Sequence, residues 1–132
     1  MVSMVTKKLV QIRSFNVIGK DTRGLTAEFF LSRQQDKFVF VSRKEGSLSG
    51  NTYHEGKNPA TKPKIFILLT GKIILSYRKI GTDQKYSQEI EAPTIIEISP
   101  QVTHKVEALN DFVLLECNSL KDIQNDRIKE EV

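Results

Sequence analysis

The chain has one cysteine, no internal repeat and no segment of low complexity. A single cysteine excludes an internal disulfide. Cys117 ends an apolar run, which is typical of a reduced core residue in a cytoplasmic protein. No polarising side chain stands beside it in the sequence, so Cys117 is not predicted to be a nucleophile. No apolar run approaches the roughly 18 residues of a membrane span, and none is predicted.

Residues 1–8 lack the apolar core of a secretory signal, so none is predicted there. The 132 residues are 39% hydrophobic and 27% charged, which suits one globular domain with a core of its own. We therefore expect a single cytoplasmic domain over 1–132.

Positive charge is in modest excess, with a net charge of +4, and it is scattered. The basic residues form only short clusters, at 7–8, 43–44 and 62–64. No nucleic-acid-binding motif accompanies them, so a nucleic acid partner is not predicted. A small phosphate-bearing ligand suits this charge better than DNA does.

Short β-rich runs separated by turn signals fill most of the chain, and no long segment has a helical period. The expected strands are 9–18, 25–31, 38–41, 65–69, 73–77, 94–98, 103–109 and 112–117. Such a series is typical of a β-sandwich or barrel, including the double-sheet jelly roll. The core is expected over about 9–118, and 119–132 is either a charged C-terminal tail or a short helix. The loop 58–63 is longer than a hairpin needs, and is either functional or a plain surface insertion.

Most of the residues that could bind a ligand or take part in catalysis lie in two short segments, 49–54 and 100–104. Residues two apart in a strand share a face, so Thr52 and His54 point the same way. If the strands close into a barrel, these side chains, Lys64 and His104 could meet in its interior. The periodicity alone does not decide whether they do.

Several blocks in the right order resemble RmlC-like cupins. This group includes dTDP-4-dehydrorhamnose 3,5-epimerases, dTDP-4-keto-6-deoxyhexose 3,4-ketoisomerases and the cupin domain of capsular polysaccharide enzymes. The similar blocks, which span about 18–118, are Asp21-Thr22-Arg23-Gly24 with Glu28 and Phe30, Ser49-Gly50-Asn51-Thr52-Tyr53-His54, 66–71, 80–83 and 98–104.

The resemblance implies an all-β double-stranded β-helix, the jelly-roll cupin barrel, and a homodimer that exchanges an N-terminal strand, here 9–18. It also implies an isomerase or epimerase of a nucleotide-linked 4-keto sugar in cell-surface polysaccharide biosynthesis. The residues that it assigns to substrate binding are Arg23, Glu28, Asn51, Thr52 and Tyr53. The candidate catalytic residues are His54 and His104 for proton transfer, and Lys64 as a cation that could polarise the carbonyl.

Three departures from the family pattern leave the activity open. Serine stands at 49 where the family has arginine, Thr52 replaces the histidine that serves as base, and Lys64 replaces a glutamate. His54 lies about 7 Å along the strand from the usual base position. The alternative hypothesis is a non-catalytic cupin that binds a nucleotide sugar or saccharide, or that assists a partner enzyme.

The same departures bear on metal binding and on each candidate residue. His54 and His104 are the remaining metal candidates, and a lysine ammonium repels a cation, so no metal cofactor is predicted. A metal-dependent dioxygenase is a third reading, and it would require iron. Each candidate also has an ordinary structural alternative: packing for Tyr53, solvation for Arg23, Glu28 and Lys64, and a hydrogen-bonded but uncatalytic histidine at 54 or 104.

Overall fold

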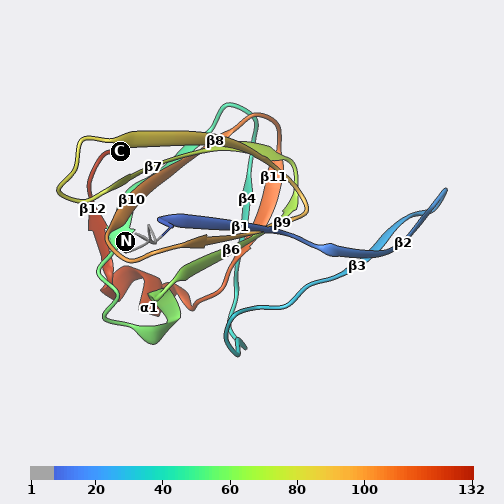
Figure 1. Cartoon of the computed structure of the whole chain (residues 1–132), viewed down its shortest axis with the longest axis horizontal. Coiled ribbons are helices and arrows are strands. Elements are labelled where there is room, and N and C mark those ends of the chain that lie inside the picture. Colours follow the sequence, from blue (N-terminus) through green and yellow to red (C-terminus); the bar gives the residue numbers. More distant parts are fainter. Residues whose placement is uncertain (1–7) are drawn as a thin grey trace, which may run out of the picture.

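A computed structural model describes residues 8–132 and consists almost entirely of antiparallel strands (Figure 1). The strands are β1 (Val10–Ser14), β2 (Asn16–Asp21), β3 (Gly24–Glu28), β4 (Val39–Arg43), β5 (Leu48–His54), β6 (Lys64–Thr70), β7 (Lys72–Lys79), β8 (Lys85–Glu91), β9 (Thr94–Ile98), β10 (Val102–Ala108), β11 (Phe112–Glu116) and β12 (Arg127–Lys129). A 3-10 turn, η1 (Pro59–Thr61), and one short helix, α1 (Leu120–Asn125), complete the secondary structure of this range.

Two five-stranded sheets form the body of the molecule, in the orders β1-β9-β6-β11-β4 and β12-β5-β10-β7-β8. They face each other and enclose an interior (Figure 1), as in a double-sheet jelly roll. The prediction of an all-β jelly-roll barrel is therefore confirmed. In the described range, no helix is long and apolar enough to cross a membrane.

The core lies between the sheets and continues behind one of them. The interior cluster contains Leu68, Leu75 and Ile96, each fully buried. On the other face of β6 and β9, Ile67 and Cys117 belong to a second, smaller cluster. Cys117 is thus a core residue as predicted, and burial raises the pKa of its thiol to about 11. The thiol therefore stays protonated at neutral pH.

The β6–β7 hairpin, predicted around residues 70–72, turns at a glycine that no other residue can replace without strain. Gly71 has a φ of +93°, and a Cβ there would lie 2.4 Å from the Asp111 carbonyl oxygen. Asn110 accepts a hydrogen bond from the backbone N–H of Lys72 at 2.7 Å. This packing of two turns fixes where β6, the strand that carries Lys64, ends.

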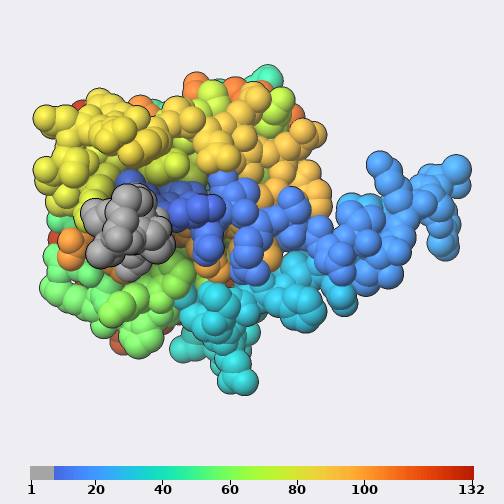
Figure 2. Space-filling model, in the orientation of Figure 1, coloured from blue at the N-terminus to red at the C-terminus, as the bar shows by residue number. Residues whose placement is uncertain are grey.

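The hairpin of β2 and β3 projects from the barrel as an arm (Figures 1 and 2). Its flanking and exposed apolar side chains are Val17, Ile18, Leu25, Phe29 and Phe30. The sequence predicts a single strand over 9–18, whereas the structure has two, β1 and β2, which are separated at Phe15. β1 pairs with β9 of the same chain, and β2 pairs with β3 on the arm. Exchange of an N-terminal strand between two copies stays a prediction.

The segment 119–132 forms the predicted short helix and then, unexpectedly, a strand. Ser119 caps α1 by accepting a hydrogen bond from the N–H of Asp122. β12 then pairs with β5 in the register Arg127 to His54 and Lys129 to Thr52. The tail alternative is therefore wrong for 120–129, which adds a strand to the barrel. Residues 1–7, where no secretory signal is predicted, lie outside the described residues.

Candidate functional site

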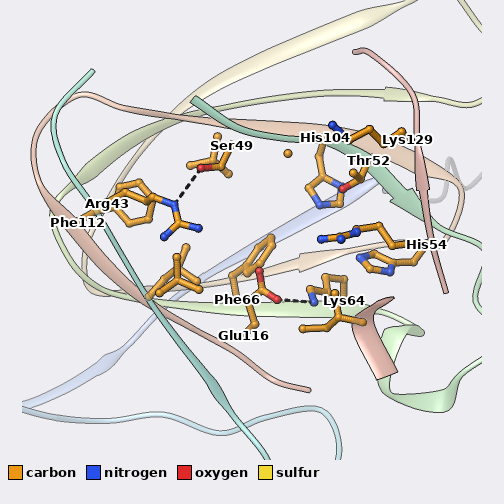
Figure 3. Close-up of a pocket in the computed structure, with 16 residues that line it drawn as sticks. Arg43, Ser49, Thr52, His54, Lys64, Phe66, His104, Phe112, Glu116 and Lys129 are labelled. Atoms are coloured by element: carbon orange, nitrogen blue, oxygen red, sulfur yellow. Dashed lines mark hydrogen bonds and ion pairs between the residues drawn. The ribbon is translucent and has the colours of Figure 1, made fainter. Parts of the chain in front are cut away.

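A cavity of about 360 Å³ lies in the barrel interior, and residues from both sheets and the C-terminal segment line it (Figure 3). Its lining residues are Val41, Arg43, Ser49, Gly50, Thr52, His54, Lys64, Phe66, His104, Val106, Phe112, Leu114, Glu116, Ile123, Arg127 and Lys129. The structure thus brings together four sequence-predicted residues: Thr52, His54, Lys64 and His104.

Local backbone geometry aims the two histidines at the same space. Thr52 and His54 are two residues apart on β5 and share one face of that strand, and Thr52 stands directly opposite His104 on β10. Gly50, with a φ of +106°, lets β5 approach β10 closely, since a Cβ there would lie 2.7 Å from the His104 carbonyl oxygen. The two imidazole centroids are 6.1 Å apart, and the Phe66 ring centroid lies 5.9 Å from that of His104 in an edge-to-face arrangement.

Both imidazoles are neutral at physiological pH. Burial, reinforced by the Lys64 charge, lowers the pKa of His54 to about 3. Burial also lowers the pKa of His104 to about 4. The hydrogen bond to the Val102 carbonyl favours the charged imidazole and opposes this shift, but it is the smaller effect. Because a carbonyl can only accept, His104 donates from Nδ1 at 3.1 Å, which leaves the Nε2 lone pair free to accept a proton.

Lys64 and Glu116 form an ion pair in the cavity, in which the lysine is buried and the glutamate is partly exposed. Lys64 Nζ lies 3.0 Å from Glu116 Oε2 and 5.5 Å from the centroid of Phe66, and the lysine side chain is 2% exposed. Burial lowers the pKa of Lys64, while Glu116 opposes that shift. Glu116 is a cavity residue that the sequence analysis did not identify, because its partner is 52 residues away and on a different strand.

Three further cations line the cavity and were not predicted. Arg43 of β4 donates from Nε to the hydroxyl of Ser49 at 3.3 Å. A guanidinium therefore lies beside position 49, where the family pattern has an arginine. Arg127 and Lys129 reach the cavity from β12. Their only sequence signal is the alternation around Ile128, which is too short to indicate a strand.

Asn51 and Tyr53 lie next to the cavity on β5 but do not line it. Tyr53 stands opposite Ile128 on the outward face of β5. The Asn51 side chain accepts a hydrogen bond from the N–H of Val132 at 3.1 Å, and its carbonyl accepts one from the N–H of Glu130 at 2.9 Å. Both residues hold the C-terminal segment in this structure, and their role in substrate binding stays a prediction.

Arg23 and Glu28 lie on the projecting arm, away from the cavity of their own chain (Figure 1). Arg23 is 89% exposed and pairs with Asp21 at 2.8 Å, at the turn between β2 and β3. Glu28 accepts a hydrogen bond from Asn16 at 3.3 Å on the same hairpin. The structure does not bring these two residues to the other candidates, and their assignment to nucleotide binding also stays a prediction.

The cavity's side chains do not suit the metal ion that many cupins bind. Within residues 8–132, no group of three His, Cys, Asp or Glu side chains is placed to hold one. Two histidines remain, but the Lys64 ammonium shares their cavity, and it would repel a divalent cation.

Asp126 ties the C-terminal segment to the loop beside the cavity. It is 4% exposed and accepts hydrogen bonds from the backbone N–H groups of Glu55 and Gly56, at 3.2 and 3.1 Å, and from the hydroxyl of Thr61. Burial alone would raise the pKa of this carboxyl, but the hydrogen bonds outweigh burial and lower it. The long loop predicted at 58–63, which contains η1, is thus held by Asp126 and does not line the cavity itself.

Comparison with known proteins gives one family and a consistent set of folds. The family model of the polysaccharide biosynthesis C-terminal domain matches residues 19–126. Comparison of the sequence with curated proteins finds no match.

Similar solved structures include QdtA, a sugar 3,4-ketoisomerase from Thermoanaerobacterium thermosaccharolyticum in complex with TDP. The TM-score is 0.70 and the identity 15%, over 92% of this chain and 88% of that one. The 3,5-epimerase RmlC from Legionella pneumophila, in complex with dTDP-4-keto-L-rhamnose, has a TM-score of 0.67 and 14% identity, over 95% and 74% of the chains. The capsular polysaccharide assembling protein CapF from Staphylococcus aureus has a TM-score of 0.61 and 22% identity, over 90% of this chain but only 35% of its own. These likenesses show the RmlC-like cupin fold that the sequence blocks predict.

Proposed function

Because this chain belongs to the polysaccharide biosynthesis C-terminal domain family, we propose that it acts on a nucleotide-linked 4-keto sugar, as an isomerase or epimerase in cell-surface polysaccharide biosynthesis. The observation that carries the proposal is the cavity itself, where a neutral histidine with a free lone pair and a buried ammonium share one enclosed space. The ketoisomerase and epimerase structures of the same fold, which hold TDP and a dTDP-keto sugar, support it.

Isomerisation or epimerisation next to a keto group needs a base, and it needs a cation near the carbonyl oxygen. In the proposed reaction, His104 Nε2 takes the proton from the carbon beside the carbonyl. The electron pair of the broken C–H bond forms a C=C bond, and the π pair of the carbonyl moves onto its oxygen. The Lys64 ammonium stabilises the resulting enolate. In an epimerisation, an acid or water on the opposite face gives a proton to the same carbon, and the His104 imidazolium later loses its proton to solvent. In a ketoisomerisation, the enolate oxygen takes up a proton to give the enediol, the hydroxyl on the neighbouring carbon loses its proton and becomes the new carbonyl, and the former carbonyl carbon accepts the proton from the His104 imidazolium. His54 Nδ1, which is buried and has no hydrogen-bond partner among residues 8–132, would contact a sugar hydroxyl.

One observation favours the alternative, a cupin that binds the sugar without converting it. The pKa values of about 3 and 4 make His54 and His104 weak bases, and Thr52 stands where the resemblance expects the base. An anionic ligand in the cavity would raise both pKa values and so strengthen the bases. An isomerase or epimerase would exchange a carbon-bound proton of the bound sugar with solvent, and a non-catalytic binding protein would not.

Binding and exchange can be measured on the same samples. We expect dTDP-, UDP- or GDP-linked 4-keto sugars to stabilise the protein in metal-free buffer, and one of them to incorporate deuterium from D₂O. His104→Gln is expected to slow that exchange by about 10²–10⁴-fold, the usual contribution of a general base, while binding persists. Lys85→Gln, an exposed substitution on β8, is the control. Stabilisation of the wild-type protein without exchange would instead support the non-catalytic function.

We also propose that the chain is one cupin domain that works in the cytoplasm as a homodimer. An isolated two-stranded hairpin is marginal by itself, and the exposed apolar side chains of the arm need a covering surface. Phe38 (45% exposed) and Phe40 (66%) lie at the outer edge of the sheet, before and on β4, and offer such a surface on a second copy. In this arrangement, Arg23 would lie beside the second copy rather than at its own cavity.

Disruption of the arm's apolar surface is expected to yield monomers. In light scattering coupled to gel filtration, the wild-type protein should have twice the 15.0 kDa chain mass, and Ile18→Glu should shift it toward one chain. Lys20→Glu, on the same strand, is the matched control because it changes charge without removing an apolar side chain. A monomeric wild-type protein, or a variant that stays dimeric, would contradict the arm-mediated dimer.

A further inference from the structure

The cavity carries more positive charge than its single carboxylate can neutralise. Glu116 is engaged by Lys64 at 3.0 Å. Among residues 8–132, no carboxylate lies within 4.0 Å of the charged groups of Arg43, Arg127 or Lys129. Because both histidines are neutral, three cations face this space without a counter-charge. Such a surface attracts an anion, whereas a neutral sugar would leave the charges unpaired.

Figure 3 shows how these cations are arranged around the cavity. Arg43 lies with Ser49 and Phe112 on one side, and Lys129 lies with Thr52 and His104 on the other. Arg127 and Lys129 are two residues apart on β12, so their side chains point to the same face of the sheet. They stand opposite His54 and Thr52 of β5, which share that face. Arg43 and Lys129 therefore approach a ligand from opposite sides.

The C-terminal strand holds its two cations in place. β12 pairs with β5, and the N–H of Glu130 donates to the Asn51 carbonyl at 2.9 Å. The Glu130 carboxylate accepts from Arg78 at 2.8 Å, and its carbonyl accepts from the Thr103 hydroxyl. On the other side of β12, Asp126 anchors the preceding turn. Arg127 and Lys129 are thus exposed residues on a strand whose backbone is fixed, which suits a binding residue.

We propose that Arg127 and Lys129 of β12, with Arg43 of β4, bind the diphosphate group of the nucleotide sugar. The assignment rests on the proposed function for the sugar and the nucleotide, but its anion-binding part is independent of them. A diphosphate diester carries two negative charges and several acceptor oxygens, and arginine's planar fork matches phosphate oxygens. The guanidinium beside Ser49 also supplies the charge that the family pattern places at that position. The sugar would then extend toward Lys64 and the histidines.

Binding of inorganic pyrophosphate and of dTDP, UDP and GDP, measured by calorimetry at low and at physiological salt, tests this assignment. We expect the wild-type protein to bind pyrophosphate and at least one of the nucleotides. R127Q/K129Q should weaken each of these affinities by about 10–100-fold, since a hydrogen bond to a charged group is typically worth 1.5–3 kcal/mol. It should also flatten the dependence of affinity on salt. Arg43→Gln should weaken binding in the same way.

Lys121→Gln is the matched control, because this exposed lysine of α1 does not line the cavity. The melting temperatures of all variants are compared first, so that a loss of affinity is not mistaken for unfolding. A second pair, R127K and K129R, keeps the charges and should retain most of the affinity.

The outcomes separate this inference from the proposed function. Unchanged affinity of R127Q/K129Q for a nucleotide that the wild-type protein binds would overturn the inference and leave the function standing. Pyrophosphate binding that depends on Arg127 and Lys129, without binding of any keto-sugar nucleotide, would support the anion site and contradict the function. Absence of binding to pyrophosphate and to all three nucleotides would overturn both.

Discussion

Glu116→Gln is expected to lower the free energy of unfolding by about 3–5 kcal/mol, the usual cost of removing one partner of a buried ion pair. The physical reason is the burial of Lys64, which is 2% exposed and whose ammonium lies 3.0 Å from the Glu116 carboxylate. Without that carboxylate, the ammonium is left buried with no opposing charge, or it loses its proton. Urea unfolding at pH 7 measures the difference.

Two controls make this prediction specific to the buried pair. Glu89→Gln removes the partner of Lys72 from a pair that is 39% and 58% exposed, and it should cost less than about 1 kcal/mol. The double variant Lys64→Met/Glu116→Leu should recover most of the stability lost in Glu116→Gln, because two well-packed apolar side chains often replace a buried pair at little cost. A Glu116→Gln protein as stable as the wild type would show that Lys64 is not held as a buried charge.

Acidification from pH 6.5 to 4 is expected to remove about 3–6 kcal/mol of stability, and the loss begins before the carboxylates titrate. The pKa values of His54 and His104 in the folded chain are about 3 and 4, against 6.5 when unfolded. Below pH 6.5 the unfolded chain therefore binds two protons that the folded chain does not, and each pKa unit is worth 1.36 kcal/mol. Stability falls as the pH falls, until the folded imidazoles also take up protons.

The double variant His54→Gln/His104→Gln isolates this contribution. It should flatten the dependence of unfolding free energy on pH between 6.5 and 4. The lowered pKa of Asp126 contributes stability that is lost mostly below about pH 4, so it affects only the lower edge of this window. If the wild-type curve is flat between pH 6.5 and 4, the histidines are not buried as neutral groups.

The sequence predicts those parts of the fold that depend on local pattern. The Gly71 turn, the alternation of Thr52 and His54, and the buried run ending at Cys117 are each visible within a few residues. The family blocks add what pattern cannot supply, namely that β5, β6 and β10 bring Thr52, His54, Lys64 and His104 to one cavity. Local signals and a recognised order of blocks together are thus sufficient for the barrel and the centre of the site.

The remaining features depend on contacts between residues distant in sequence. Arg43 of β4 donates a hydrogen bond to Ser49 of β5, and Lys64 forms an ion pair with Glu116, which is 52 residues away in the sequence. β12 is three residues long and charged, so only its pairing with β5 makes it a strand. Arg23 has the family's residue type, but the direction of the arm, which no local pattern encodes, carries it away from its own cavity.

The pairing of β12 with β5 also constrains how the protein is made. The two strands are more than 70 residues apart, and they bring together cavity residues from both ends of that interval. During synthesis at about 5–20 residues per second, the barrel's central strands emerge seconds before residue 129 does. Until residue 129 has left the ribosome, the cavity lacks the wall that β12 supplies. A ligand held by Arg127 and Lys129 can therefore stabilise the chain only after β12 has paired with β5.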